Sequence, residues 1–355
     1  MQPSQHGGNV LQTARELGLE PEALRDFSAS INPLGTPDEV MAAIRASLEQ
    51  IQHYPEIDGA SLIQALAEHH QMAPGHFVPG SGSTELIYLL PRVLRPRRAL
   101  LLAPCFSEYA RSLAQIGCSV DYHLLSAEDN FLFDPLSLLH QIRPETDLIV
   151  LANPGNPAGT ALAPQALLEL AAGIREQALL LVDEAFVDFC PDHSLLPHLK
   201  HCDNVLVLRS FTKFYAMPGL RAGYLAGAPH TLARLAQARE PWTLSTPALA
   251  AARACLGAAD FRRHTLRVIP QWRGQLQKGL QELGWRVFPG EANYLLAHLP
   301  PGSTKAPQLA ATLRAQGILV RDCSNFVGLD ETYVRVAVRR PEDNQRLLHA
   351  LRTLT

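Results

Sequence analysis

Lys213 stands in a context that suits covalent chemistry. It ends the string Ser210-Phe211-Thr212-Lys213, which follows the apolar run 205–208. A lysine just past a buried strand is desolvated, so its pKa can fall and its neutral amine can attack an aldehyde. A solvated surface lysine is the default interpretation of one lysine alone. Here the string continues to Arg221, whose guanidinium would offer forked donors to a phosphate held nearby by Ser210 and Thr212.

Two more polar residues follow apolar runs and could hold a heterocyclic ring. Asp183 ends the run 179–182, and a buried carboxylate is costly unless it is paired. A protonated pyridine nitrogen is a suitable partner, because each charge favours the other; an ordinary salt bridge or helix cap is the alternative. Asn156 lies in Asn-Pro-Gly-Asn-Pro-Ala-Gly after the run 148–152 and could direct its amide at a ring oxygen, although turn chemistry also explains such a segment.

The run Gly80-Ser81-Gly82-Ser83-Thr84-Glu85 could bind an anion. It enters a helical pattern that starts at Leu86. Glycines let the backbone approach a ligand, and the exposed amides of a helix N-terminus together with the hydroxyls of Ser83 and Thr84 suit a phosphate. The alternative is a plain turn with a capping residue. Taken together, the four motifs supply every protein group that a pyridoxal 5′-phosphate (PLP) site needs.

The elements that position these motifs are short apolar runs at 99–103, 148–152, 179–182 and 205–208. They are too short for helices and do not alternate, which predicts parallel strands covered on both faces, with helices such as 164–177 between them. Ligands of such α/β sheets bind beyond the carboxyl ends of the strands. The sequence therefore predicts a mostly parallel central sheet flanked by helices in a large domain over residues 41–243.

The pattern changes after about residue 244. We expect helices over 245–257 and 260–283, the second interrupted at Pro270, then strands near 285–288 and 293–299. A helix near 306–316, a strand near 333–338 and a closing helix from Pro341 complete the chain. These elements predict a smaller α+β domain that consists of residues 244–355 and the N-terminal arm 1–40.

Composition excludes several other classes of protein. The chain has 355 residues, 47% hydrophobic and 18% charged, and its net charge of −3 gives no reason to expect nucleic acid or an anionic membrane as partner. It has no apolar run of the roughly 20 residues that a membrane span needs, and no secretory signal at its start. Its six cysteines form no C-x-x-C pair, which favours buried thiols in a reducing cytoplasm. We expect no metal.

The order of the motifs G-x-G-x-x-E, N-P-x-N-P-x-G, D-E-A-F and S-x-T-K…G-L-R-x-G-Y resembles the class I/II PLP-dependent aminotransferases, most closely their histidinol-phosphate aminotransferase branch. The resemblance implies the PLP-dependent transferase fold type I. It makes Lys213 the Schiff-base lysine and gives Phe106 the role of stacking on the cofactor ring. Tyr54 would reach the cofactor phosphate of a neighbouring subunit, which implies a homodimer with active sites at the interface. The implied cofactor-binding residues are Ser83, Thr84, Phe106, Asn156, Asp183, Ser210, Thr212, Lys213, Arg221 and Tyr54.

Within that branch the chain is similar to the threonine-phosphate decarboxylases of cobalamin biosynthesis. The segments that carry this likeness are His6-Gly7-Gly8-Asn9 and residues 26–35, 208–216, 321–325 and 333–339. It implies decarboxylation of O-phospho-L-threonine to (R)-1-aminopropan-2-yl phosphate and CO2. Arg335 would bind the substrate carboxylate, and Arg321 with His6 and the Gly7 backbone would bind its phosphate. The implied substrate-binding residues are His6, Gly7, Ser30, Asn156, Arg321 and Arg335.

Some positions depart from these patterns. The decarboxylase pattern has asparagine at Ser30, and many relatives carry other residues at Ser81, Gly155 and Ala158. Phe186 stands where aminotransferases usually have tyrosine, which favours the decarboxylase. The alternative activity is that of a histidinol-phosphate aminotransferase, which depends on a 2-oxoacid acceptor. A noncatalytic PLP-binding module would need an attached basic DNA-binding segment.

Overall fold

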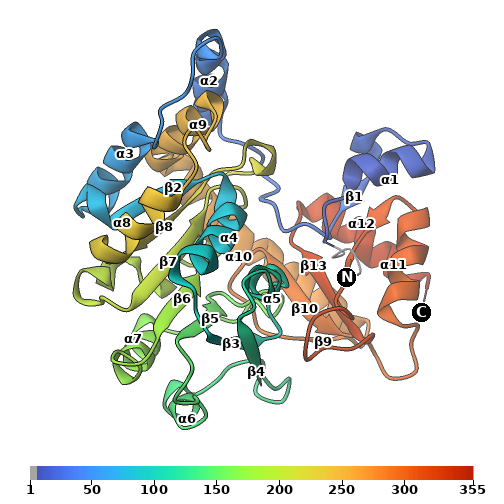
Figure 1. Cartoon of the computed structure of the whole chain (residues 1–355). Coiled ribbons are helices and arrows are strands. Elements are labelled where there is room, and N and C mark those ends of the chain that lie inside the picture. The colour runs from blue at the N-terminus through green and yellow to red at the C-terminus, as the bar shows by residue number, and fades with distance from the viewer. Residues whose placement is uncertain (1–5, 355) are drawn as a thin grey trace.

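The central element of the computed structural model, which describes residues 6–354, is a mixed sheet of seven strands within those residues. Its order is β2-β8-β7-β6-β5-β3-β4 (Figure 1). β8 runs antiparallel to both its neighbours, and the other pairs are parallel. The four strands predicted from apolar runs are confirmed as β3, β5, β6 and β7. The strands are β2 (Phe77–Gly80), β3 (Arg98–Ala103), β4 (Ser119–Leu124), β5 (Leu148–Ala152), β6 (Leu179–Asp183), β7 (Val205–Ser210) and β8 (Gly223–Gly227).

Helices cover both faces of this sheet, as continuous apolar strands require. In β6, Leu180 packs into the core that contains Leu62 and Leu167, whereas Leu181 packs into the core that contains Leu86 on the other face. Full burial of each such side chain stabilises the fold by about 1.5–3 kcal/mol. The helices are α2 (Asp38–Ser47), α3 (Ala60–His70), α4 (Gly82–Leu94), α5 (Glu108–Ala114), α6 (Pro135–Leu139), α7 (Pro164–Gly173), α8 (Pro229–Ala238) and α9 (Thr246–Gly257).

The C-terminal third forms a separate antiparallel sheet with the order β12-β13-β10-β9. The N-terminal segment joins this part of the molecule, because β1 pairs in parallel with β11 and Phe27 lies in the same core as Leu276. Figure 1 shows α1 and β1 beside α11 and α12. The elements are α1 (Val10–Leu17), β1 (Arg25–Asp26), α10 (Ala259–Glu282), β9 (Arg286–Val287), β10 (Tyr294–His298), α11 (Ala306–Ala315), β11 (Ile318–Leu319), β12 (Arg321–Asp322), β13 (Tyr333–Ala337) and α12 (Pro341–Arg352).

The expected interruption at Pro270 is wrong, because α10 continues through it. A proline inside a helix costs about 3 kcal/mol. Before Pro270 the helix packs through Ile269 against the core of the large sheet, and after it the helix packs through Leu276 against the C-terminal core. This two-sided burial holds the helix continuous despite the missing amide.

The division into residues 41–243 on one side and residues 1–40 with 244–355 on the other stays a proposal. Phe27 lies in the C-terminal core, as this division expects. α9, by contrast, buries Leu249 and Ala252 in the same core as Leu62 of α3. Among residues 6–354, no helix combines the length and the apolar character that crossing a membrane requires.

Candidate active site

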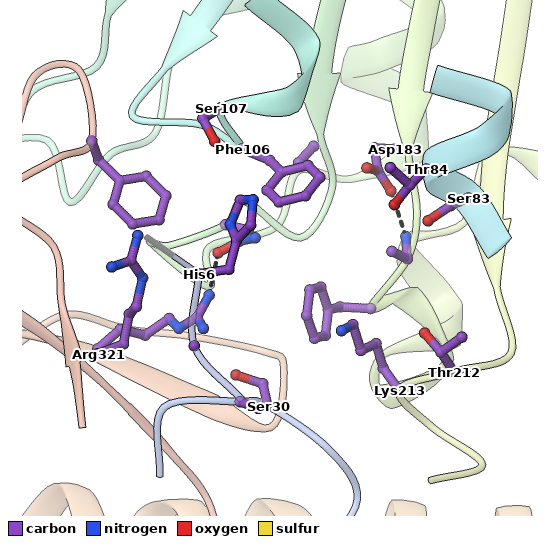
Figure 2. A pocket seen from close by; sticks show the side chains of 18 of the residues that line it. His6, Ser30, Ser83, Thr84, Phe106, Ser107, Asp183, Thr212, Lys213 and Arg321 are labelled. Carbon is purple, nitrogen blue, oxygen red and sulfur yellow. Dashed lines mark hydrogen bonds between the residues drawn. The ribbon is translucent and has the colours of Figure 1, made fainter. Parts of the chain in front are cut away.

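The carboxyl ends of the parallel strands open into a cavity of about 210 Å³. Figure 2 shows Asp183, Thr84 and Lys213 on one side of it, Arg321 on the other, and His6 between them. The structure therefore brings together most of the side chains singled out from the sequence. The predicted residues that line the cavity are His6, Gly7, Ser30, Ser83, Thr84, Phe106, Asn156, Asp183, Thr212, Lys213, Arg221, Arg321 and Arg335.

Lys213 follows the end of β7 directly and lines this cavity. Burial, together with the charges of Arg335 and Arg221, lowers the pKa of its amine to about 8, and the charge of Asp183 opposes this shift. An amine with this pKa is substantially neutral near pH 8, and the neutral form is the nucleophile. The location after a buried strand, predicted from the apolar run, is the cause of the shift.

Covalent capture of an aldehyde by Lys213 is expected to depend on pH with a midpoint near 8. The rate should fall as pH drops below the pKa, because the ammonium form has no lone pair, and should level off above it. An unperturbed lysine would titrate near 10.4. Stopped-flow absorbance after mixing the cofactor-free protein with PLP across pH 6–11 measures the profile. A midpoint near 10.4 would contradict the desolvated setting.

Asp183 is the last residue of β6 and is buried at the cavity wall. Burial raises the pKa of its carboxyl, while hydrogen bonds from Tyr109 and the Ala185 amide and the charge of Lys213 oppose this. The Tyr109 hydroxyl donates to Asp183 Oδ2 over 2.5 Å. Sequence reasoning missed Tyr109, because its partner lies 74 residues away in the chain. A cationic nitrogen in the cavity would find a carboxylate already oriented toward it.

The motif that the sequence predicts to bind phosphate forms a cradle at the N-terminus of α4. The helix begins at Gly82, four residues earlier than the pattern predicted, so Ser83 and Thr84 lie in its first turn. Gly82 has φ +76°, and a Cβ at this position would come within 2.4 Å of Arg221 Nη2. The Arg221 guanidinium therefore lies directly against the start of the helix. Two hydroxyls, a helix N-terminus and a guanidinium converge where an anion would bind.

Two predicted cofactor residues lie outside the cavity lining. The Ser210 hydroxyl is buried and shares a hydrogen bond of 2.7 Å with the Thr212 hydroxyl, so Ser210 lies behind Thr212. The Tyr54 side chain is 83% exposed and packs against Trp242, with 5.0 Å between the ring centroids. Its predicted contact is with a neighbouring subunit, so that contact stays a prediction.

The small sheet brings two arginines to the opposite side of the cavity. Arg321 of β12 and Arg335 of β13 are partners in the antiparallel register. Arg321 donates to Asn325 Oδ1 over 2.7 Å, and its guanidinium lies 5.0 Å from the centre of the Phe326 ring. Burial lowers the pKa of Arg321, and Arg335 adds to this effect. Two buried guanidiniums side by side favour binding of an anion, because an anion offsets their mutual repulsion.

Two hydrogen bonds within the protein orient Arg335. It donates to Asn156 Oδ1 over 2.5 Å and to the Ser28 carbonyl over 2.8 Å. Its Nε is buried and has no hydrogen-bond partner among the residues that the structure describes. Asn156 and Arg335, which were predicted to serve cofactor and substrate, are thus linked directly to each other.

The N-terminal arm contributes His6 and Gly7 to the cavity lining. His6 Nε2 lies 3.0 Å from Glu108 Oε1, and the His6 ring is 5.4 Å from that of Phe106. Gly8 donates its amide to Ser28 Oγ, and a Cβ at Gly7 would overlap the Ser28 carbonyl at 2.2 Å. Only glycine can pack so closely there. Sequence reasoning assigned no role to Glu108, which belongs to none of the motifs, or to Ser28, which lies within the segment 26–35 but was not singled out.

Ser30 is buried at the cavity wall, and its hydroxyl has no partner among residues 6–354. A buried hydroxyl without a hydrogen bond costs about 1–3 kcal/mol, which a ligand would recover. A substrate group bonded to the Ser30 hydroxyl would supply the missing partner. That contact stays a prediction.

Comparison with known proteins places the chain in a family. The model of aminotransferase class I and II matches residues 23–351. The chain belongs to the aminotransferase class I and II family. This confirms the family that its motifs resemble and, with it, the fold type I architecture.

Individual members of this family align with nearly the whole length of the chain. It is 39% identical to the threonine-phosphate decarboxylase of Salmonella typhimurium, over 99% of this chain and 96% of that protein. The structure of L-threonine-O-3-phosphate decarboxylase from Porphyromonas gingivalis has a TM-score of 0.83 at 28% identity and covers 92% of this chain and 98% of its own. The structure of histidinol-phosphate aminotransferase from Clostridium acetobutylicum has a TM-score of 0.87 at 28% identity and covers 93% and 98%.

PLP is the cofactor of this family, and the cavity fits it. The cradle that a Cβ at Gly82 would fill suits the phosphate, and the buried Asp183 carboxylate suits the ring nitrogen. Phe106 lines the same cavity as Lys213, whose amine suits the aldehyde. The roles of individual residues remain proposals.

Proposed function

We propose that this protein is a PLP-dependent carboxy-lyase that converts O-phospho-L-threonine to (R)-1-aminopropan-2-yl phosphate and CO2 in cobalamin biosynthesis. One observation carries the proposal: a single cavity is lined by Lys213 and Asp183 and also by Arg321 and Arg335, and Arg321 lies across it from Lys213 (Figure 2). A substrate with both a carboxylate and a phosphate matches these two guanidiniums. The relative with 39% identity is a threonine-phosphate decarboxylase.

The chain's own residues would act chiefly by orientation. When bound, PLP serves as a sink for the electron pair released as the Cα–carboxylate bond breaks. Arg321 and His6 hold the substrate phosphate at one side, and Arg335 holds the carboxylate. Anchoring at these points would orient the substrate so that its Cα–carboxylate bond, and not its Cα–H bond, is the one that breaks. Positioning of this kind selects which bond breaks.

Lys213 would complete the reaction by moving a proton. Its Nζ, with a pKa near 8, can carry a proton at neutral pH and release it to Cα after CO2 has left. Asp183 would hold the ring nitrogen of the cofactor and favour a positive charge on it. The His6 arm, in contact with Glu108 and Phe106, limits the entry of water.

Release of CO2 from O-phospho-L-threonine without any 2-oxoacid tests the proposal. We expect stoichiometric CO2 and 1-aminopropan-2-yl phosphate from the PLP-loaded protein. The alternative is transamination, as in the histidinol-phosphate aminotransferase whose structure matches with a TM-score of 0.87. Turnover of histidinol phosphate that requires 2-oxoglutarate, with no CO2 from phosphothreonine, would establish that alternative instead.

The cofactor site would be completed in a homodimer. Tyr54, Ile57 and Trp242 are large exposed apolar residues, and they adjoin one another through the Tyr54–Trp242 ring contact and the hydrogen bond from the Trp242 amide to the Ile57 carbonyl. Leu48 and Ile51, nearby in the chain, are also exposed. Apolar surface gathered in this way is typical of an interface. It contains Tyr54, the residue predicted to reach the neighbouring cofactor.

We expect a mass of two chains in sedimentation equilibrium at micromolar concentration. Trp242→Glu should shift the protein toward the monomer, because a charge would be buried without a partner at the interface. Glu282→Gln, a change at an exposed position of α10, is the control. A wild-type protein that stays monomeric would refute the dimer.

The proposed location is the cytoplasm. All six cysteines are free thiols, and five of them are buried. Unpaired buried thiols are typical of proteins that fold in a reducing compartment.

A further inference from the structure

Tyr109 contacts two groups of the cofactor site at once. It lies in the first turn of α5 and is buried, with 2% of its surface exposed. Its hydroxyl donates to Asp183 Oδ2 over 2.5 Å, and its ring meets that of Phe106 edge to face at 5.8 Å and 83°. Asp183 and Phe106 both line the cavity. One side chain therefore connects the acid at the end of β6 with the aromatic ring that follows β3.

The hydrogen bond bears on the charge of Asp183. The carboxyl is buried, and each of its oxygens accepts one hydrogen bond: Oδ1 from the Ala185 amide over 2.9 Å and Oδ2 from Tyr109. A buried carboxylate is stable only when such donors replace the water it has lost. Among the influences that favour the ionised form of Asp183, the bond from Tyr109 is the largest, ahead of the Ala185 amide and Lys213.

Tyr109 is a permanent donor. Burial and the neighbouring charge of Asp183 raise its pKa well above the ordinary value for tyrosine, so its hydroxyl keeps its proton at any working pH. The phenol therefore stays neutral and adds no negative charge to the site. It also occupies one acceptor direction of Oδ2 and so restricts the carboxylate to an orientation in which the remaining lone pairs are available to the cavity.

We propose that Tyr109 is a positioning residue for PLP, which keeps Asp183 ionised and aimed at the ring nitrogen while it holds Phe106 in place for stacking. This inference rests on the cofactor assignment of the proposed function but not on the substrate. Tyr109 acts through Asp183 and Phe106, so its removal weakens the binding of the cofactor itself.

The test is the affinity of the cofactor-free protein for PLP, with no substrate present. Tyr109→Phe keeps the ring and its contact with Phe106 but removes the donor to Asp183. We expect the dissociation constant for PLP to rise about tenfold to a hundredfold, the effect of losing a hydrogen bond to a charged group. The visible absorption of the bound cofactor should also titrate at a higher pH, because a less positive ring nitrogen repels a second proton more weakly.

A matched control is available on the neighbouring helix. Tyr88 of α4 also donates to a carboxylate over 2.5 Å, but its partner is Glu108. Tyr88→Phe makes the same chemical change outside the cofactor set, and we expect unchanged affinity for PLP. Thermal unfolding of the cofactor-free variants should show that both remain folded, since each keeps its aromatic ring.

A double-mutant cycle separates action through Asp183 from a general packing effect. In an Asp183→Asn background the bond from Tyr109 reaches a neutral acceptor, so the loss caused by Tyr109→Phe should shrink severalfold. An equal loss in both backgrounds, or wild-type affinity and titration in Tyr109→Phe, would overturn the inference. Neither result would bear on the decarboxylase proposal, because that proposal is tested separately by CO2 release.

Discussion

Lys213→Ala is expected to abolish the covalent attachment of PLP and with it the visible absorption band of the loaded protein. Alanine has no amine to condense with the aldehyde, and no other lysine lines the cavity among the residues that the structure describes. Turnover should fall by more than about a thousandfold, because proton transfer to Cα alone is worth roughly 10²–10⁴ in rate. Absorbance after dialysis against PLP, together with CO2 release, measures both effects.

Lys278→Ala is the matched control for this change. Lys278 is exposed on α10, far in sequence from the motifs of the site, and its replacement should leave both the band and turnover as in the wild type. Circular dichroism of Lys213→Ala should match the wild type, since removing a partly desolvated amine does not cost stability. A normal absorption band that persists in Lys213→Ala would refute the assignment of Lys213 as the residue that binds PLP covalently.

Arg335→Lys is expected to give the largest effect on substrate recognition. Lysine keeps the charge but loses the fork that donates at once to Asn156 Oδ1 and to the Ser28 carbonyl. A substrate carboxylate would then face a single ammonium group in place of the oriented guanidinium. We expect kcat/KM for O-phospho-L-threonine to fall about a hundredfold, in line with a cost of about 2–5 kcal/mol for breaking a buried charge pair.

Arg340→Lys is the control, because Arg340 is exposed and its Nε donates to the Pro33 carbonyl. It should leave kcat/KM within about twofold. The absorption of bound PLP should survive in Arg335→Lys, which separates loss of substrate binding from loss of cofactor. Arg321→Ala supplies a second comparison: its effect should be large with phosphothreonine and small with threonine, which lacks the phosphate. Unchanged kinetics in both arginine variants would refute the substrate model and leave the cofactor model intact.

Much of the site could be predicted from local sequence, because its reactive residues lie at or just after the ends of strands that apolar runs reveal. Lys213 and Asp183 follow buried strands, and the apolar runs that form those strands are visible in the sequence. The carboxyl ends of parallel strands meet at one edge of a sheet. Predicting the strands therefore predicted that these residues would converge on a single cavity.

Local errors arose where packing overrode propensity. α10 passes through Pro270, since it buries residues against both cores, and burial of several apolar side chains exceeds the cost of one proline. α4 starts at Gly82, where the absence of a Cβ leaves room for Arg221, a residue that lies far along the chain. Neither cause is visible in the window of residues that a pattern spans.

The amino-acid sequence by itself predicted four strands of the central sheet, the family and the candidate reactive groups, because apolar runs and motifs can be read along the chain. Only the tertiary structure decided which distant groups meet. The bond from Tyr109 to Asp183, the register that sets Arg321 beside Arg335, and the contact of His6 with Glu108 all join separate elements. Such contacts depend on how the two cores and the N-terminal arm pack together, which the spacing of residues along the chain does not encode.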